Sequence, residues 1–571
     1  MALNFYDFEV FQHDWLVVII NPMRRNKEII VNDRDKLTEY YDRHKDEIWV
    51  GYNSRNYDQY ILKGILLGLN PKYINDAIIV HGKKGWQIDR RFNNVQLYNY
   101  DTMANVKLMG LKQLEAFMGN NIKETSVPFN LNRRLTQSEL DETIRYCTHD
   151  VEQTMEVFLK RKSEFDAHID LIRTFDLPIS CVSLTQAQLT AKILGCRKVK
   201  RNDEFDLKIV DTLKIEKYRH VVDWFKSPVN LNYEASLETD VCGVPHTFGW
   251  GGLHGCPSHP VHIKGDLVHV DVTSYYPSIM IEYDFLTRNC KDKGKFKQIY
   301  DKRVELKRQG KKKEQAPYKI ILNSTYGICK DEYSPAYDPR QANNVCVNGQ
   351  LMLLDLLEHL EPYCSIIQSN TDGLIIHSRM MDKVEAVCHE WEQRTGMGLG
   401  FDYISEIWQG DVNNYIFRFT NGKLERKGSY VKELNALDND LPIVNEAIVR
   451  FLTEGVSPDD TINACEELIK FQKVVKVSSK YNCAYHNGFR LTDKTFRVFA
   501  SKDHRDTSLF KMKTESSRPE KFANTPEHCF IYNYELNGKK AMDKLDKRWY
   551  IELARERIEN KFGISMTPTL L

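Results

Sequence analysis

The sequence predicts an α/β protein built from several domains. Its 571 residues exceed what a single hydrophobic core usually organises. Residues 1 to about 165 alternate short apolar runs (WLVVII, EIWVGY and AIIVHG) with helical stretches, a pattern typical of an α/β domain. The pattern of apolar and helical segments then changes along the chain, without an internal repeat, so we expect further domains of different structure.

Charge and cysteine usage exclude several classes of protein. The 80 basic and 79 acidic residues nearly balance, so the total charge indicates no partner and local clusters matter instead. The 13 cysteines lack the paired short spacings of zinc sites or of a secreted disulfide framework, and we expect reduced thiols. No apolar run near the start is long enough to cross a membrane, and no basic stretch followed by an apolar one opens the chain. We therefore expect a soluble cytoplasmic protein without a membrane partner.

The segments after residue 165 have individual signatures. Residues 166 to about 245 are predicted to be helical and then irregular, and they end at the glycine-rich GWGGLHG of residues 249–255. An apolar strand (DLVHVDV) follows, then a basic helical segment at 291–327 and a further helix at 346–360.

Two later stretches have clear signatures. SIIQSNTDGLII is typical of two strands joined by a tight turn at Thr371-Asp372-Gly373. The last helix carries apolar residues on one face, which we expect to pack inward: Ile551, Ala554, Ile558 and Phe562.

The opening strand, YDFEVF, carries two acids. Asp7 and Glu9 lie two positions apart, so both carboxylates point to the same face of the strand. Like charges repel there unless a cation lies between them, which indicates a divalent metal. The exposed face of an edge strand explains this pair alone equally well, and further acids are needed to decide.

Two later stretches supply those acids. NSRNYD contains Asn53 and Asp58, and YCTHD places Tyr146 and Asp150 four positions apart on one helical face. The stretch TQSE at 136–139 predicts a capping box at the start of that helix.

The order Asp-x-Glu, Asn-x-x-x-Tyr-Asp and Tyr-x-x-x-Asp resembles the three motifs of proofreading 3′–5′ exonuclease domains. The resemblance implies a ribonuclease-H-like fold. It also implies that Asp7, Glu9, Asp58 and Asp150 hold two metal ions, one activating water and the other stabilising the leaving 3′ oxygen. By the same resemblance, Tyr146 would orient the attacking water and Asn53 would hold the frayed strand end.

A second set of motifs resembles the family B DNA polymerases. HVDVTSYYPSIM at 269–280 matches their Asp-x-x-Ser-Leu-Tyr-Pro-Ser pattern, and KIILNSTYG at 319–327 matches Lys-x-x-x-Asn-Ser-x-Tyr-Gly. SNTDG falls where the family has Tyr-x-Asp-Thr-Asp-Ser at the tip of a hairpin, so Asp372 corresponds to the second aspartate of that motif. The resemblance implies a right-hand polymerase with palm, fingers and thumb.

The same resemblance implies a two-metal polymerase site. Asp271 and Asp372 would bridge two Mg²⁺ ions, with Val272 also among the metal-binding residues and Mn²⁺ able to substitute for Mg²⁺. One ion would lower the pKa of the primer 3′-OH and the other would hold the triphosphate. Asn370 stands where the family has an acid, so the site would depend on two carboxylates.

The basic segment at 291–327 would supply positive charge. Gly310 is expected to separate two helices that present Arg303, Lys307 and Lys319 to the nucleotide phosphates, whereas Lys311, Lys312 and Lys313 point to solvent or template backbone. Asn323 and Tyr326 would form the floor beneath the nascent base pair. Tyr276 would press against the sugar C2′ and favour deoxynucleotides.

Two DNA contacts match the family pattern less closely. GWGGLHG resembles the loop between exonuclease and polymerase domains, where Gly251 and Gly252 would let template phosphates approach the backbone, and a tight structural turn explains these glycines almost as well. KLERKGSYVK at 423–432 resembles the element that holds the primer strand, with Lys427 and Tyr430 as candidates.

The resemblance divides the chain into six expected segments. They are a 3′–5′ exonuclease domain (1–165), a linking region that ends in the glycine-rich loop (166–255), a first part of the palm (256–290), the fingers (291–327), a second part of the palm (328–425), and the thumb with C-terminal helices (426–571).

The spacing between motifs indicates a compact enzyme. The 48 positions from Asp271 to Lys319 and the 46 positions from Tyr326 to Asp372 leave no room for the insertions of protein-primed relatives. We expect a monomeric, phage-like polymerase that binds primer-template DNA, dNTPs and phage replication proteins. Two alternatives stay open: a nuclease whose polymerase half is an inactive scaffold, and a nucleic-acid-binding or structural protein with neither activity.

Overall fold

The computed structural model describes residues 2–103, 109–514 and 518–566 and has a mixed α/β fold, as predicted. The chain divides into two compact units, each made from separated segments. Unit 1 comprises Met1–Thr185, Leu434–Val444 and Asp459–Ile551, and unit 2 comprises Gln186–Glu433, Asn445–Pro458 and Glu552–Leu571. Residues 459–551 therefore group with the N-terminal residues, and the functions of the six expected segments stay predictions.

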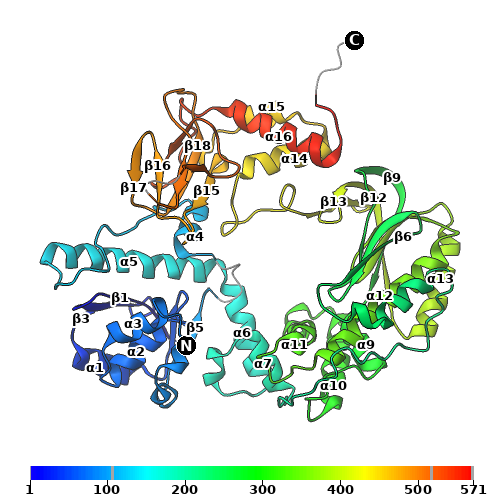
Figure 1. Ribbon diagram of the computed structural model, residues 1–571, viewed down its shortest axis with the longest axis horizontal. Helices are drawn as coiled ribbons and strands as arrows, with labels where there is room; N and C mark the ends of the chain where they lie inside the picture. The colour runs from blue at the N-terminus through cyan, green and yellow to red at the C-terminus, as the bar shows by residue number, and fades with distance from the viewer. Residues whose placement is uncertain (1, 104–108, 515–517, 567–571) are drawn as a thin grey trace. The chain divides into compact units, whose positions relative to one another are not determined.

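Unit 1 contains a five-stranded sheet with strand order β3-β2-β1-β4-β5, drawn in blue in Figure 1. β1 pairs antiparallel with β2 and parallel with β4. The strands are β1 (Leu3–Val10), β2 (Trp15–Asn21), β3 (Asn26–Val31), β4 (Ile48–Gly51) and β5 (Tyr98–Asp101). The helices of the same region are α1 (Arg34–His44), α2 (Asp58–Leu66), α3 (Pro71–Ile79), α4 (Leu111–Met118), α5 (Gln137–Lys160) and α6 (Lys162–Thr174), with 3-10 turns η1 (Gly85–Gln87), η2 (Arg90–Asn94) and η3 (Ile179–Ser183).

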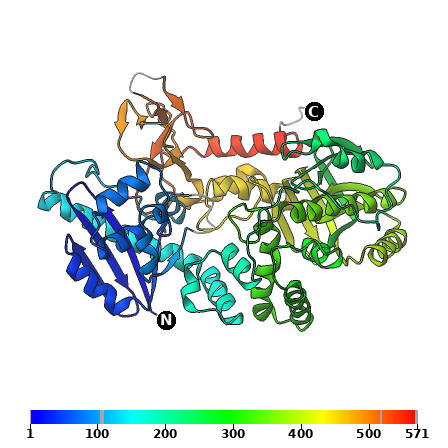
Figure 2. The ribbon, with the colours of Figure 1, turned by 60° about the horizontal axis from the view of Figure 1, so that its bottom comes forward.

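The two faces of β1 have different roles because successive side chains alternate across a strand. Tyr6, Phe8 and Val10 join a core formed with helices α1, α2 and α3. The odd-numbered side chains face α5, where Phe5 meets Phe158 edge to face at 5.2 Å. The face of β1 that carries its two acids therefore points toward α5. Figure 2 shows the blue sheet that contains β1 from another side.

The C-terminal part of unit 1 is a module of short strands. Sheets of order β15-β18-β21 and β17-β16-β19-β20 pack together, and β15 and β18 contact α4. The fully buried Arg497 donates to the Tyr534 carbonyl within the module (2.8 Å) and attaches the module to the N-terminal part by donating to the Asn120 carbonyl. The elements are α15 (Pro458–Ala464), η5 (Leu468–Phe471), β15 (Lys473–Lys476), β16 (Cys483–His486), β17 (Phe489–Leu491), β18 (Thr495–Ala500), β19 (Phe510–Met512), β20 (Glu520–Lys521) and β21 (Cys529–Ile531).

Unit 2 is built on a nine-stranded sheet of order β14-β13-β12-β9-β11-β10-β8-β7-β6. Its strands are β6 (Ser236–Val241), β7 (Val244–Gly249), β8 (His254–Gly255), β9 (Val261–Val272), β10 (Ser365–Ser369), β11 (Gly373–His377), β12 (Leu399–Asp411), β13 (Asn414–Phe419) and β14 (Leu424–Lys427). β9 lies between β12 and β11, so the strand that carries Asp271 is central in the sheet.

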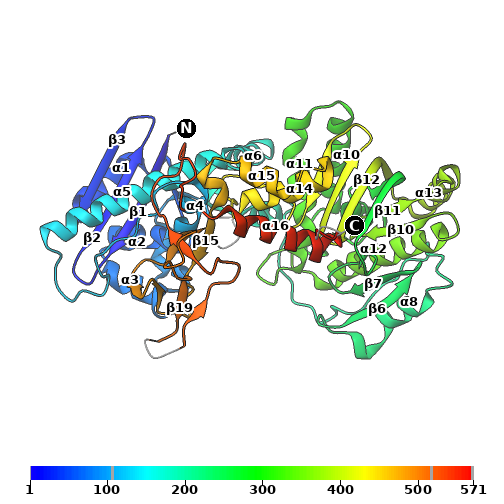
Figure 3. The same ribbon diagram turned by 90° about the horizontal axis from the view of Figure 1, so that it is seen from above.

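The helices of unit 2 include one that is buried along almost its whole length. This helix, α12, contacts α9, α11 and α13. Figure 3 shows α12 with α11 and α13 in unit 2. The helices are α7 (Gln186–Ile193), α8 (Arg219–Lys226), η4 (Pro228–Asn230), α9 (Tyr275–Glu282), α10 (Lys293–Arg308), α11 (Lys312–Lys330), α12 (Pro339–Leu360) and α13 (Met381–Thr395). Two further helices, α14 (Pro442–Glu454) and α16 (Lys547–Phe562), include residues of both units, and so does α15, whose first residue, Pro458, belongs to unit 2.

Several sequence predictions are confirmed at the level of elements. Residues 365–377 form two antiparallel strands around a turn, and Gly310, with φ of +71°, separates α10 from α11. Thr136 and Glu139 form the predicted capping box of α5. The apolar face of α16 is buried at all four predicted positions.

Two predictions need correction. AIIVHG belongs largely to the end of α3 rather than to an independent apolar run of the sheet, because Ala77 and Ile78 continue the helical period of Ile74. The irregular region before residue 245 contains β6, whose SLETDV has few large apolar residues to signal a strand. In the part of the chain that the structure describes, no helix is both long and apolar enough to span a membrane.

Candidate catalytic carboxylate sites

The first candidate site is formed on the α5-facing side of β1. Asp7 and Glu9 share this face, and Glu9 is buried. The Cys147 thiol of α5 donates to the Asp7 carbonyl oxygen at 3.4 Å. Ligand atoms of Asp7, Glu9 and Cys147 all lie within 4.8 Å of one another. The alternation predicted for this strand therefore does bring the two carboxylates together.

Asp58 reaches the same site from the first position of α2. Its carboxylate accepts a hydrogen bond from the backbone N–H of Phe8, between the two acids of β1, at 3.2 Å. Asp58 is buried with 3% of its surface exposed. A helix N-terminus favours a carboxylate, and the bond to the strand fixes its place. The structure thus brings Asp58 to Asp7 and Glu9 as the sequence predicts.

Helix α5 contributes Tyr146 and Asp150 from successive turns, together with a basic partner from α4. Lys112 donates from its Nζ to Asp150 and also to Glu115 at 3.0 Å. The same Nζ lies 4.6 Å from the centre of the Tyr146 ring, a cation–π contact. Sequence reasoning missed Lys112 and Glu115, because α4 carries no motif that marks them.

The acids of this site perturb one another. Burial, followed by the charge of Asp58, raises the pKa of Asp7 well above its ordinary value, and burial with Asp150 does the same for Glu9. Burial raises the pKa of Asp58 to about 7. Burial raises the pKa of Asp150 to about 6 against the lowering effect of Lys112. Ionised carboxylates so arranged repel unless a cation joins them.

The donor set fits a hard divalent cation. Carboxylate oxygens are the ligands that Mg²⁺ and Mn²⁺ prefer, whereas a thiolate suits softer metals. Burial and the nearby Asp7 raise the pKa of Cys147, so its thiol keeps its proton and donates to Asp7. The carboxylates gathered here thus suit a hard divalent cation, with Cys147 as a neighbour rather than a ligand, and the choice of Mg²⁺ stays a prediction.

Asn53 lies in the loop between β4 and α2, in a left-handed conformation with φ of +59°. Its backbone N–H donates to Asp101 at 2.8 Å, and the same carboxylate accepts from the backbone N–H groups of Arg55 (3.0 Å) and Met103 (2.9 Å). Asp101 thus holds the loop that presents Asn53. Sequence reasoning missed this buried acid, which lies at the end of β5 outside the motifs.

The second candidate site lies where β9 meets the turn between β10 and β11. Asp271 pairs directly with Gly373 across the antiparallel strands, and the Val272 N–H donates to the Asp372 carbonyl at 2.8 Å. Burial, followed by the charge of Asp372, raises the pKa of Asp271 to about 6. The Val272 side chain is a hydrocarbon without a ligand atom, so only its backbone carbonyl could bind a metal. The two predicted acids are therefore neighbours.

The turn that carries Asp372 is held from two sides. Gly252, with φ of +143°, lies so close to Thr371 that a Cβ there would be 3.1 Å from the threonine hydroxyl oxygen. His246 takes a hydrogen bond from the Ser369 hydroxyl at 2.5 Å, since its other ring nitrogen donates to the Val244 carbonyl at 2.8 Å. No sequence motif indicates His246. The glycine-rich loop thus packs on the acidic turn.

The basic helices lie beside this second site. Lys307 of α10 is exposed and lowers the pKa of Asp271, which places its charge near the carboxylates. Arg303, one turn earlier, donates to the Ser274 hydroxyl. Lys319 and Asn323 are exposed one turn apart on α11. The contacts of Lys307 and Arg303 bring α10 close to the carboxylates. Lys319 lies on α11, the next helix in the chain.

Two aromatic rings meet between α9 and α11. The Tyr276 and Tyr326 ring centres are 4.5 Å apart at an angle of 56°. The Tyr326 hydroxyl is buried without a hydrogen-bond partner among the described residues. The two tyrosines assigned to the nucleotide pocket by sequence are therefore in contact.

The two predicted primer-strand residues sit elsewhere on unit 2. Lys427 ends β14, and its Nζ lies 5.7 Å from the ring centre of Tyr415. The Tyr430 ring lies against the Arg557 guanidinium, 4.6 Å away. Gly251 is exposed, and a Cβ at this position would meet no described atom within 4 Å, so the backbone leaves space for a ligand. None of these contacts reaches a carboxylate of the site directly. Burial, followed by the charges of Glu425 and Asp372, raises the pKa of Tyr415, which places Asp372 near the ring that Lys427 contacts.

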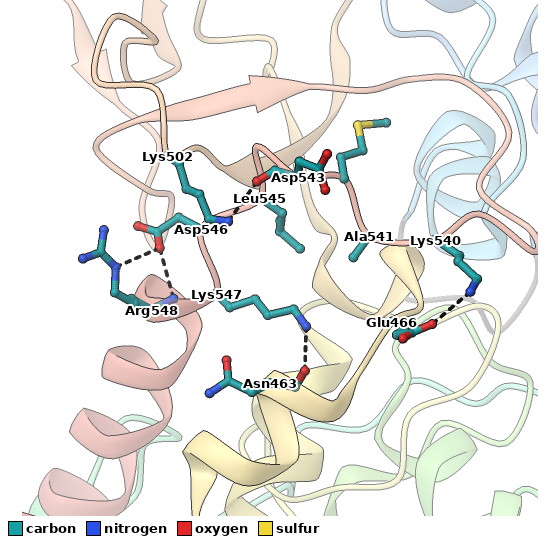
Figure 4. Close-up of a pocket in the computed structure, with 11 residues that line it drawn as sticks. Asn463, Glu466, Lys502, Lys540, Ala541, Asp543, Leu545, Asp546, Lys547 and Arg548 are labelled. Carbon is teal, nitrogen blue, oxygen red and sulfur yellow. Dashed lines mark hydrogen bonds and ion pairs between the residues drawn. The ribbon is translucent and has the colours of Figure 1, made fainter.

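A separate hollow of about 570 Å³ lies in the C-terminal part of unit 1 (Figure 4). Its basic residues are already engaged: Lys502 donates to the Asp543 carbonyl at 2.9 Å, and Lys547 donates to the carbonyls of Asn463 and Cys465 at 2.8 Å each. None of the residues predicted for catalysis lines it. The two clusters of acidic residues, one on each unit, therefore remain the candidate catalytic sites.

Comparison with known proteins gives partial matches. No family model matches the chain. DNA polymerase 1 of Sulfolobus acidocaldarius is 27% identical over 222 residues, which are 38% of this chain and 24% of that protein. DNA polymerase 1 of Saccharolobus solfataricus is 23% identical over 269 residues, 44% of this chain and 30% of the relative. The chain is similar to DNA polymerases.

This similarity to DNA polymerases covers only part of each sequence. The match to DNA polymerase 1 of Sulfurisphaera ohwakuensis is 25% identical over 191 residues, 33% of this chain and 21% of that protein. The chain thus spans about a quarter of the length of these relatives. The solved structure of the family B DNA polymerase from Pyrobaculum calidifontis aligns with 100% of this chain and 78% of its own, at a TM-score of 0.43 and 14% identity, too low to define the fold.

Proposed function

We propose that this chain is a family B DNA polymerase that adds dNTPs to a primer 3′-OH under the direction of a template, with a 3′–5′ proofreading exonuclease in the same chain. Asp271 and Asp372, with the Val272 carbonyl, would hold two Mg²⁺ ions for synthesis. Asp7, Glu9, Asp58 and Asp150 would hold two for degradation. When bound, the ions would supply charge neutralisation and an activated oxygen nucleophile at each site.

One observation carries the polymerase proposal. Asp271 and the Asp372 turn come from motifs 101 positions apart in the chain, and β9 and β11 place them side by side. Phosphoryl transfer depends mainly on positioned charge, so two adjacent acids beside a basic helix are the minimum that the reaction needs. The relatives named DNA polymerase 1 support the same function.

The residues around this pair would bind the nucleotide. Lys307 and Lys319, with Arg303 behind them, would neutralise the triphosphate, because cations near the phosphates stabilise the charge that moves to the leaving group. Tyr276 would contact the sugar C2′ and so discriminate against ribonucleotides. Tyr326, which packs on Tyr276, would support the nascent base pair, and Asn323 would lie beside it on the same helix.

The exonuclease proposal rests on the four clustered acids and their two neighbours. Tyr146 would orient the attacking water, and Lys112, tied to Asp150 and to the Tyr146 ring, would hold both in place. Asn53, fixed by Asp101, would hold the end of the strand being shortened.

The remaining assignments concern DNA and cellular setting. Gly251 and Gly252 would contact the template backbone, and Lys427 and Tyr430 the primer strand. The fingers would be residues 291–327, and the palm residues 256–290 and 328–425. We further propose a monomeric, phage-like replication enzyme of the cytoplasm that acts with phage replication proteins.

A primer-extension assay tests the proposal. A 5′-labelled primer on a longer template is incubated with the full chain and Mg²⁺, with and without dNTPs, and with EDTA as the metal-free control. Lengthening with dNTPs and shortening without them, both abolished by EDTA, are the expected results. Shortening under both conditions would replace the proposal with the nuclease alternative. Binding without any change in primer length would leave a DNA-binding protein.

A further inference from the structure

Two cysteines far apart in the sequence meet in unit 2. Cys196 follows α7, and Cys290 lies three residues before α10. Their sulfur atoms are 3.0 Å apart, and the two residues form an isolated antiparallel bridge. Residues opposite one another in antiparallel pairs have Cα atoms about 4.5–5.5 Å apart, within the range that a disulfide needs. The backbone therefore already has the geometry for a bond between the two sulfurs.

The surrounding contacts hold both residues in this register. The Arg197 N–H donates to the Asn289 carbonyl at 3.0 Å, next to the sulfurs. The Asn289 side chain in turn donates to the carbonyls of Pro335 (3.2 Å) and Tyr337 (2.8 Å). Closing the bond thus requires rotation of the two side chains rather than movement of the chain.

We propose that Cys196 and Cys290 form a reversible dithiol–disulfide pair, a modification site that connects the end of α7 to the start of the α10–α11 hairpin. Its chemical partner is a small disulfide of the glutathione type. The proposal goes beyond the proposed polymerase function and does not depend on it, because it concerns only the covalent state of unit 2.

The exchange balances without any other reagent. Cys196, which is the more exposed of the two, attacks the small disulfide as a thiolate and releases one small thiol. Cys290 then loses its proton and attacks the Cys196 sulfur of the mixed disulfide, releasing the second small thiol. The protein loses two protons and two electrons, and the small disulfide is reduced to two thiols.

The bond would close a loop of more than ninety residues between the two cysteines. Cross-linking distant positions lowers the conformational entropy of the unfolded chain, more so for longer loops. Since α7 also packs on α11, the disulfide would reinforce a contact already present in the reduced protein. We therefore expect oxidation to raise the thermal midpoint of unit 2 by several degrees.

Peptide mapping tests the pair directly. The full chain is equilibrated with oxidised glutathione or with dithiothreitol, alkylated under denaturing conditions and digested with trypsin. The expected product in the oxidised sample alone is a linked species of the tryptic peptides ILGCR (193–197) and NCK (289–291). The absence of this species at equilibrium with oxidised glutathione, or pairing of either cysteine with a different one, would overturn the proposal.

Variants separate the pair from the other thiols. Cys196→Ser should lose both the linked species and the rise in thermal midpoint. Cys364→Ser, which removes another half-buried thiol of unit 2, should keep both. Because the wild-type peptide map needs no variant, a failure of Cys196→Ser to fold would leave the main test intact. A linked species without any rise in the midpoint would refute the reinforcing role.

Discussion

Replacing Asp58 by asparagine should stabilise the metal-free protein at pH 8 while removing 3′-end degradation. Burial raises the pKa of Asp58 to about 7, against about 3.9 for an exposed aspartate, and at about 1.4 kcal/mol per pH unit the difference corresponds to roughly 4 kcal/mol. The folded protein holds the proton more tightly than the unfolded chain does. Ionisation therefore costs stability progressively between about pH 4 and pH 7, and the cost is fully present above pH 7.

Asparagine avoids this cost because it cannot ionise. Its side-chain oxygen can still accept from the Phe8 N–H, which the aspartate accepts at 3.2 Å. Its amide N–H groups need partners in a buried place, and an unmade hydrogen bond there costs about 1–3 kcal/mol. The net expectation is a free energy of unfolding about 1–3 kcal/mol higher at pH 8. At pH 5, where most of the ionisation cost is absent, we expect no gain.

Chemical denaturation in EDTA at pH 5 and pH 8 measures this difference. Asp166→Asn, which changes a half-exposed aspartate of α6, is the matched control and should alter stability by less than about 0.5 kcal/mol at either pH. Added Mg²⁺ should stabilise the wild type more than Asp58→Asn at pH 8, because the variant lacks one carboxylate ligand. If Asp58→Asn is equally destabilised at both pH values, the reasoning about the cost of ionising this buried carboxylate is wrong.

Three further predictions concern unit 2. Tyr276→Ala should raise ribonucleotide use relative to deoxynucleotide use by at least about tenfold, or about 1.4 kcal/mol; unchanged discrimination in single-nucleotide kinetics would assign sugar selection to another group. Asn370→Ala should raise the free-energy barrier of single-turnover extension by about 1–3 kcal/mol, as expected for a lost hydrogen-bonding group. Asp372→Asn should remove nearly all extension. Equal losses in the two variants would make Asn370 part of the catalytic core. The Arg394 guanidinium contacts both oxygens of the fully buried Asp355 carboxylate at 2.8 Å. Arg394→Ala removes this partner and should lower the free energy of unfolding by about 3–5 kcal/mol. A loss below about 1 kcal/mol in urea unfolding would contradict this prediction.

The elements that carry motifs could be predicted because local rules determine them. The two-residue alternation of β1 puts Asp7 and Glu9 on one face, and the capping box at Thr136 starts α5 in the phase that presents Asp150. The strand–turn–strand around Asp372 follows from its apolar flanks and its glycine. In each case the signal lies within a few residues of the site.

The residues that hold these motifs in place could not be predicted in the same way. Lys112 meets Asp150 across 38 positions, and His246 meets Ser369 across 123. Neither has a sequence pattern, because only the packing of distant elements brings the partners together. The association of residues 459–551 with unit 1 has the same cause, since Arg497 and Asn120 are 377 positions apart.

The closeness of Cys196 to Cys290 shows the limit of spacing arguments. A sequence separation of 94 positions matches no metal or disulfide signature, so the sequence predicts only reduced thiols. An antiparallel bridge between two irregular segments makes them neighbours. Long-range pairing of this kind depends on topology, which local periodicity does not contain.

We infer that separate carboxylate groups on separate units would perform synthesis and degradation. Single-turnover reactions of one labelled primer-template with Asp271→Asn and with the double variant Asp7→Asn, Glu9→Gln test it most directly. We expect Asp271→Asn to lose extension and still shorten the primer at the wild-type rate in Mg²⁺, while the double variant extends the primer and no longer shortens it. Near wild-type extension by Asp271→Asn, or loss of both activities in either protein while it stays folded, would rule out separate sites for the two reactions.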